Sequence, residues 1–84
     1  MKYKLNKRCR LKLRLKGWRY ISRGYWKLEF EDEEGGIFIW ETHKSNKTLE
    51  ILGNPSKRGK WHIIEMRIID YWQGEYYINY CKLK

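Results

Sequence analysis

The sequence predicts one all-β domain over residues 1–84, with five strands and a short helix or loop between the third and fourth strands. Segments in which apolar and polar residues alternate with a period of two, as in half-buried strands, recur along the chain. Polar segments that contain glycine separate them, as turns do. A chain of this length builds only a modest core, which must draw on five Trp and seven Tyr. We expect the polar residues 1–7 to be flexible.

The first predicted strand has the clearest alternation. Apolar residues from Cys9 to Leu15 share one face, and every residue of the other face, from Arg8 to Lys16, is basic. Gly17 interrupts the pattern, which is typical of a bulge or bend where one long strand serves two sheets of a small barrel. Trp18 and Tyr20 share the parity of the basic face, although a bulge at Gly17 would move them to the other side.

Residues 25–42 predict a β-hairpin. Trp26, Leu28 and Phe30 alternate with charged residues, and Asp32 to Gly36 supply turn-forming residues. The strand that follows, Ile37 to Trp40, is apolar on both faces. It must therefore be covered on both faces or keep one of them for a partner.

The register of this hairpin stays open. A four-residue loop places Phe30 opposite Ile37 and leaves Phe38 and Trp40 on the outer face. A shift by one residue buries Phe38 and Trp40 and exposes Ile37 and Ile39, because a slip in register exchanges the two faces of a strand.

The second half of the chain predicts a short helix and two more strands. Residues 48–52 favour one or two helical turns, capped by Ser45 or Asn46 and ended by Gly53 and Pro55. The two strands are Trp61 to Trp72 and, after a hairpin at Gln73 and Gly74, Tyr76 to Leu83.

Positive charge dominates, with a net charge of +9, but it is unevenly placed. Residues 1–27 carry eleven Lys or Arg and no acid, residues 28–42 carry six acids and no base, and residues 43–60 carry five bases and one acid. Such an excess predicts a polyanionic partner. The acidic cluster lacks the ligand spacing of a calcium loop. We interpret it as a solvated turn that offsets the basic surface; repulsion of duplex phosphates or docking of a basic protein are the alternatives.

Other functional classes find little support. Cys9 and Cys81 are too few for a disulfide framework or a zinc site, and we expect free thiols in a reducing cytoplasm. The basic start lacks the apolar core of a signal peptide, and no apolar run approaches the roughly 20 residues that span a bilayer. His43 and His62 stand without a nucleophile or carboxylate at motif spacing, and no phosphate-binding glycine motif occurs. We therefore expect neither an enzyme nor a bound cofactor or metal.

Several short motifs carry a resemblance to a known family. The chain contains the run GYWKLEFEDEEGGIFIWET, followed by Gly59-Lys60-Trp61, an Ile-rich strand and YWQGEYYINYCKLK. In this order the motifs resemble the small OB-fold domains of bacterial and phage replication-type proteins that bind single-stranded DNA. The shared features, spread over residues 10–84, are the turn Asp32 to Gly35, Trp40, the strand-leading Gly59 and the hairpin Tyr71 to Gly74.

The resemblance implies a five-stranded OB-like Greek-key barrel. It also implies a binding surface across the second and third strands and the loops Tyr20–Gly24 and Tyr71–Glu75. The chain departs from the family at Met66, where a glycine is expected, in a shorter final hairpin, and in lacking a K-G-F-G-F stretch of the cold-shock type. Shape alone would also fit an SH3-like barrel.

The function predicted from these features is non-enzymatic binding of single-stranded DNA or RNA, DNA in preference, with little sequence specificity. A cationic groove that follows the phosphates and aromatic rings that stack on bases are what such binding requires. The alternative is a protein-interaction module, such as a small phage-encoded inhibitor that docks on a partner protein. The candidate nucleic-acid-binding residues are Arg10, Lys12, Arg14, Lys16, Trp18, Arg19, Tyr20, Arg23, Tyr25, Lys27, Trp40, Lys57, Arg58, Lys60, Trp72 and Tyr76.

Overall fold

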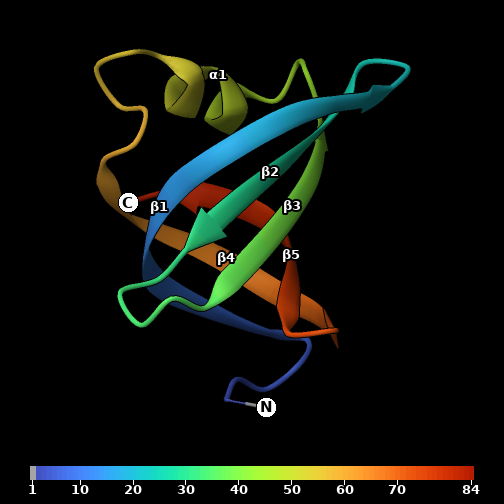
Figure 1. The fold of residues 1–84 in the computed structure, drawn as a ribbon, viewed down its shortest axis with the longest axis vertical. Coiled ribbons are helices and arrows are strands. Elements are labelled where there is room, and N and C mark those ends of the chain that lie inside the picture. Colours follow the sequence, from blue (N-terminus) through green and yellow to red (C-terminus); the bar gives the residue numbers. More distant parts are fainter. Residues whose placement is uncertain (1) are drawn as a thin grey trace.

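The computed structural model describes residues 2–84, which form a closed five-stranded β-barrel (Figure 1). The strand order around the barrel is β1-β2-β3-β5-β4, and all neighbours are antiparallel except the parallel pair β3–β5. This confirms the predicted class, an OB-like all-β barrel with a short helix between the third and fourth strands. The elements are β1 (Lys7–Ser22), β2 (Tyr25–Glu31), β3 (Ile37–His43), α1 (Lys47–Gly53), β4 (Trp61–Trp72) and β5 (Glu75–Leu83).

The long strand β1 pairs with β4 along its first half and with β2 along its second half. The register with β2 shifts between Leu15 and Gly17, so the predicted bulge is present. As a result Trp18 stands opposite Leu28, a fully buried residue. The bulge therefore moves Trp18 from the basic face to the barrel-interior side, as one of the two sequence-based alternatives foresaw.

The β2–β3 hairpin has a five-residue loop, because Glu31 pairs with Ile37. Phe30 pairs with Phe38, so both point into the barrel, and the four-residue-loop register was wrong. Ile39 lies on the outer face as the shifted register predicts, yet its side chain is only 1% exposed. Its cross-strand neighbours are Glu29 of β2 and Tyr77 of β5.

Asp32 stabilises the loop of this hairpin. Its carboxylate Oδ1 accepts hydrogen bonds from the backbone N–H groups of Glu34 (2.9 Å) and Gly36 (2.7 Å). Asp32, one member of the acidic cluster, therefore has a structural role, as the side chain of Asp commonly has in a turn.

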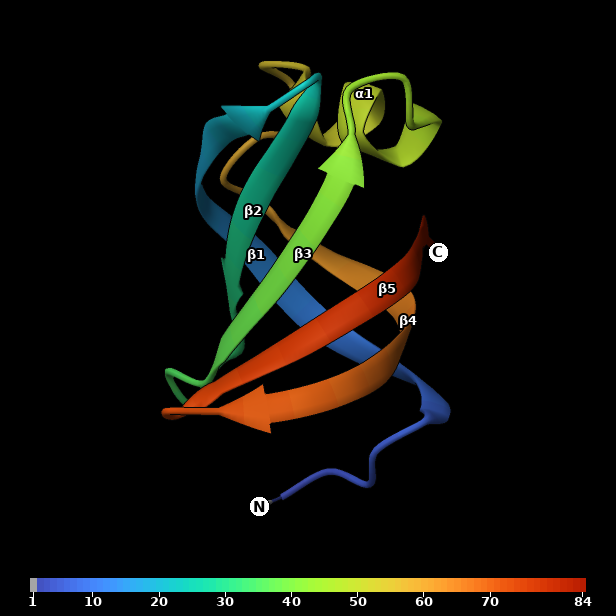
Figure 2. The ribbon, with the colours of Figure 1, turned by 90° about the vertical axis from the view of Figure 1, so that its right-hand side faces the viewer.

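Both ends of the barrel are closed by apolar side chains. Leu52 of α1 is buried at one end, where the helix lies across the barrel (Figures 1 and 2). At the other end the ring of Tyr3 lies 5.8 Å from the ring of Phe38 and 5.2 Å from that of Tyr76, centroid to centroid. The backbone N–H of Lys2 also donates to the Tyr76 hydroxyl at 2.9 Å. Lys2 and Tyr3 thus contact the barrel, while the flexibility of residues 1–7 stays a prediction; residue 1 lies outside the described residues.

The helix α1 follows the predicted capping. The Asn46 side chain accepts from the N–H of Thr48 at 2.9 Å, and the helix ends at Gly53, two residues before Pro55. None of the helices in residues 2–84 has the length and apolar character that crossing a membrane requires.

The two cysteines are free thiols on strands separated by β4. The Cys9 Sγ lies 3.5 Å from the Sδ of Met66, and burial raises the pKa of the Cys81 thiol far above its ordinary value. A thiol held in this protonated form is a poor nucleophile, so Cys81 serves as an apolar core residue.

Candidate nucleic-acid interface

The outward cations of β1 from Arg8 to Lys16 lie beside carboxylates of neighbouring strands and loops. Along the strand no acid is interspersed, but β2, β4 and the β2–β3 loop place acids at the positions opposite, where opposite charges attract across a sheet. The pairs are Arg8–Glu65 (2.9 Å), Arg10–Glu65 (3.2 Å), Lys12–Glu33 (3.7 Å), Arg14–Glu31 and Lys16–Glu29 (3.7 Å).

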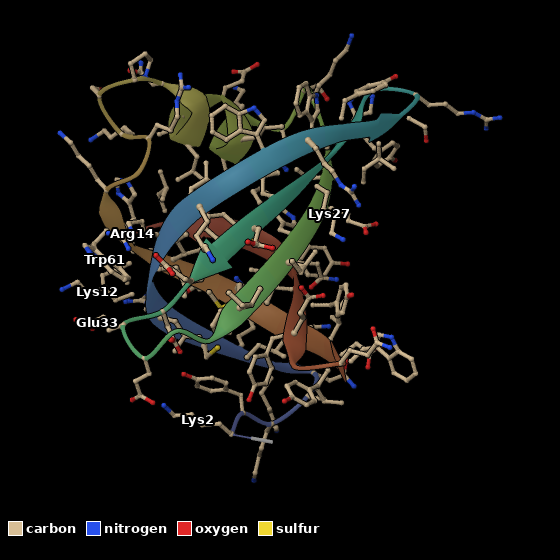
Figure 3. All side chains as sticks on the ribbon, in the orientation of Figure 1. Lys2, Lys12, Arg14, Lys27, Glu33 and Trp61 are labelled. Atoms are coloured by element: carbon tan, nitrogen blue, oxygen red, sulfur yellow. The ribbon has the colours of Figure 1, made fainter. Side chains whose placement is uncertain are left out.

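Trp61 adds a further contact to this face (Figure 3). The Arg14 guanidinium carbon lies 4.7 Å from the centroid of the Trp61 ring, and the Lys12 ammonium lies 6.0 Å from it. These are cation–π distances. The middle of β1 is thus a network of cations, carboxylates and one indole, and a phosphate would have to compete with carboxylates already in place.

Glu65 is the most connected carboxylate of this network. Hydrogen bonds from Arg8 and Arg10, together with the charge of Lys84, hold its pKa below the ordinary 4.5. A lowered pKa in the folded state contributes stability above the unfolded-state pKa, and that contribution is lost as the pH falls through the folded-state pKa.

We therefore expect Glu65 to titrate below pH 4.5 when its side-chain carboxyl is followed by NMR. We also expect Glu65→Gln to flatten the acid limb of the stability curve, measured by urea unfolding from about pH 6 to 3. Glu50→Gln is the control, because Glu50 is exposed and forms no ion pair within residues 2–84. A Glu65 that titrates at or above 4.5 would contradict the network.

Most of the cations without a carboxylate partner in residues 2–84 lie in a different part of the molecule. We call the end formed by residues 17–27 and 43–60 the α1 end; it is the upper part of Figure 1. Its residues include eight Lys or Arg and a single acid, Glu50. Among the described residues 2–84, no carboxylate forms an ion pair with any of the eight: Arg19, Arg23, Lys27, Lys44, Lys47, Lys57, Arg58 and Lys60.

Aromatic rings are exposed at the same end. Trp18 is 40% exposed, and Tyr20 and Tyr25 are more exposed still. The ring of Tyr20 meets that of Trp26 edge-on at 5.8 Å, and the ring of Tyr25 meets that of His43 edge-on at 5.3 Å. Each exposed ring is thus held in place on one side and open on another.

The turn between β1 and β2 fixes the outermost of these residues. Arg23 (φ 50°) and Gly24 (φ 81°) both have positive φ, as a two-residue type I′ hairpin turn requires. A Cβ at Gly24 would lie 3.0 Å from the His43 Nε2, so glycine also allows the close approach of β3. The Gly24 N–H donates to the Tyr20 hydroxyl at 3.2 Å, which ties that ring to the turn.

Two cations face each other directly on the outer side of this end. Arg19 and Lys27 are cross-strand partners and, together with Gly17, Trp18 and Glu29, line a shallow hollow of about 300 Å³. Like charges directly opposite each other destabilise a sheet. A bound anion such as a phosphate would relieve this repulsion.

The outer surface of β3 and β5 has the opposite charge. Burial raises the pKa of Tyr77, and the negative charges of Glu75, Glu41 and Asp70 raise it further. We call these three acids and Tyr77 the acidic patch. Trp72, 62% exposed, lies next to it in the β4–β5 hairpin, far from the α1 end in both ribbon views (Figures 1 and 2). This patch lies on the surface that the resemblance implies for binding, and it repels phosphates.

The structure separates the sequence-predicted residues into three groups. Trp40 and Tyr76 are buried in the core, so they are corrected: neither ring is available for stacking on a base. Trp72 lies beside the acidic patch, and Arg10, Lys12, Arg14 and Lys16 are paired with acids. The α1 end brings together Trp18, Arg19, Tyr20, Arg23, Tyr25, Lys27, Lys57, Arg58 and Lys60.

Sequence reasoning missed Lys44, Lys47 and Trp26. The two lysines lie in a polar stretch whose basic character was visible, but only the topology places that stretch beside the β1–β2 turn. Trp26 was noted only for its alternation with charged residues, and the structure shows it half-buried on the wall of a hollow.

No group of three or more His, Cys, Asp or Glu suited to hold a metal ion occurs in residues 2–84. Comparisons with family models, curated proteins and solved structures find no match to this chain.

Proposed function

We propose that this protein binds single-stranded nucleic acid at the α1 end of its barrel, without catalysis and with little sequence preference. The observation that carries the proposal is that eight cations, none of them paired with a carboxylate of residues 2–84, lie at the same end as three exposed aromatic rings. The resemblance to OB-fold replication-type domains favours DNA over RNA.

The cations and the exposed aromatic rings would make different contributions to the binding free energy. Cations neutralise phosphates and release condensed counterions, a contribution that does not depend on sequence. Exposed rings accept any base by stacking, at about 1–3 kcal/mol per base. The surface of the α1 end offers both within the reach of a few nucleotides, since the Arg58 guanidinium carbon lies 4.7 Å from the centroid of the Trp18 ring.

The acidic patch supports the same location by exclusion. Phosphates are repelled from the outer surface of β3 and β5, where Glu41, Asp70 and Glu75 surround Tyr77. A strand that binds this barrel is therefore directed to the α1 end rather than across the middle of the sheet.

Titration with oligo-dT tests the proposal. We expect Trp fluorescence to be quenched, because Trp18 is exposed among the cations. With four to six phosphate contacts, log Kobs should fall against log salt concentration with a slope of about −3 to −4. Duplex DNA of equal length, whose bases cannot stack on the rings, should bind more weakly at the same salt. The absence of binding to any single strand at low salt would refute the proposal.

A protein partner is the second candidate, and the acidic patch is the observation that favours it. Carboxylates around a half-buried tyrosine, with the exposed Trp72 ring beside them, present charge and aromatic area of the kind that a basic protein surface can dock on. If oligonucleotides fail to bind, this candidate becomes the leading one.

A further inference from the structure

A hollow of about 260 Å³ opens at the α1 end, between the barrel wall and the helix. Its apolar lining comes from Leu15, Trp18 and Trp26 of the barrel and from Leu49 of α1. Two indole rings and two leucines make a lining suited to a flat ring, because aromatic surfaces favour stacked and edge-on contacts with other rings. Trp18 is 40% exposed, so the hollow is reached from the surface.

Polar groups stand at the edge of this apolar lining. Lys44 and Glu50 line the same hollow, and within residues 2–84 neither forms an ion pair. Lys44 offers a hydrogen-bond donor and Glu50 an acceptor. Every nucleobase presents both donors and acceptors on its edge, so such a rim serves a base better than it serves a purely apolar side chain.

Arg58 connects the hollow to the basic surface. Its Nη2 donates to the carbonyl oxygen of Gly53, a lining residue, at 3.2 Å. Its guanidinium carbon lies 4.7 Å from the centroid of the Trp18 ring. Guanidinium groups bind phosphates through paired hydrogen bonds, and this one is held beside an aromatic hollow with no carboxylate partner in the part of the chain that the structure describes.

We propose that this hollow receives one unpaired nucleobase, lying against Trp18 and Trp26, while Arg58 contacts the phosphate of the same or the adjacent nucleotide. The inference rests on the proposed function and adds a defined subsite to it: one base of the bound strand is held in a hollow, and the others lie on the surface. The positive charges of Arg58 and Lys44 outnumber the single carboxylate of Glu50 at this hollow, so a base that carries a phosphate on its sugar is favoured over an uncharged ring.

The test compares oligo-dT with an abasic oligonucleotide of the same length, using anisotropy of a labelled strand. Leu49→Trp should fill the hollow and leave every cation unchanged. Ile51→Trp, on the exposed side of the same helix, is the matched control. We expect Leu49→Trp to weaken oligo-dT binding roughly 5- to 150-fold, the value of one base–aromatic stack. Binding of the abasic strand, and both affinities of Ile51→Trp, should stay at the wild-type level.

The outcomes separate this inference from the proposed function. An unchanged oligo-dT affinity for Leu49→Trp would overturn the base subsite and leave the proposed function standing. No binding of any oligonucleotide by the wild-type chain would overturn both.

Photocrosslinking of the wild-type protein covers the case in which Leu49→Trp does not fold. An oligonucleotide containing 5-iododeoxyuridine should crosslink to Trp26 if a base enters the hollow, because Trp26 lines this hollow and is not among the exposed rings. Crosslinks confined to the exposed rings of Trp18, Tyr20 and Tyr25 would overturn the inference.

Discussion

Lys57→Glu combined with Lys60→Glu should weaken binding of oligo-dT by roughly 10²- to 10³-fold at low salt. Two unit charges about 4 Å apart interact by about 1 kcal/mol in water, so each reversal turns an attraction of that size into a repulsion and costs about 2 kcal/mol. Both lysines are exposed in the loop between α1 and β4, and neither forms an ion pair within residues 2–84. The affinity is measured by anisotropy at low ionic strength, where screening is weakest.

The matched control reverses two cations at the opposite end of the barrel. Lys4 and Lys7 are also exposed and, within residues 2–84, also lack an ion-pair partner. Each Lys→Glu exchange removes two units of charge, so both double variants fall from the net charge of +9 to +5. If the two variants lose the same affinity, net charge rather than the α1 end governs binding, and the proposed location is wrong.

Phe38→Ala should remove about 3–5 kcal/mol of stability, the usual cost of truncating a fully buried phenylalanine. The Phe38 ring is inaccessible to solvent and stacks on the ring of Tyr76 at 5.1 Å, with Tyr3 across it at 5.8 Å. Domains of this size are stable by only about 5–15 kcal/mol, so the loss amounts to a large fraction of the total. The melting temperature should fall by about 15–30 °C, measured by circular dichroism.

Trp72→Ala is the corresponding control, since it also truncates an aromatic side chain. Trp72 is exposed in the β4–β5 hairpin, and such surface changes usually stay within about 0.5 kcal/mol. A loss below about 1 kcal/mol for Phe38→Ala would show that Tyr3, Phe38 and Tyr76 do not form the closed end described here.

Local periodicity was enough to predict most of the fold. The alternation in β1, the bulge at Gly17 and the bounds of β4 follow from neighbouring residues along the chain, as does the Asn46 cap of α1. Each of these features depends on residues that are close together in the chain, so the sequence alone is enough to predict it.

Features that depend on which strands become neighbours could not be predicted in this way. The register of the β2–β3 hairpin follows from the length of one loop, and that register decided that Trp40 is buried. The carboxylates that pair with β1 come from β2, from β4 and from the β2–β3 loop. The sequence of β1 alone therefore predicts a larger positive charge on this face than the folded surface has. For the same reason the candidate site shifted from the middle of β1 to the α1 end.

The position of β1 between β2 and β4 has a consequence for how the chain folds. The first half of β1 pairs only with β4. Cys9, for example, pairs with Met66, which lies 57 positions later in the chain, so this edge of β1 stays uncovered until β4 has formed. Closing such distant pairs slows folding, and an uncovered strand edge invites aggregation in the meantime. Like charges repel, so the row of bases from Arg8 to Lys16 opposes edge-to-edge pairing of two incompletely folded molecules. The same residues pair with carboxylates once the barrel has closed.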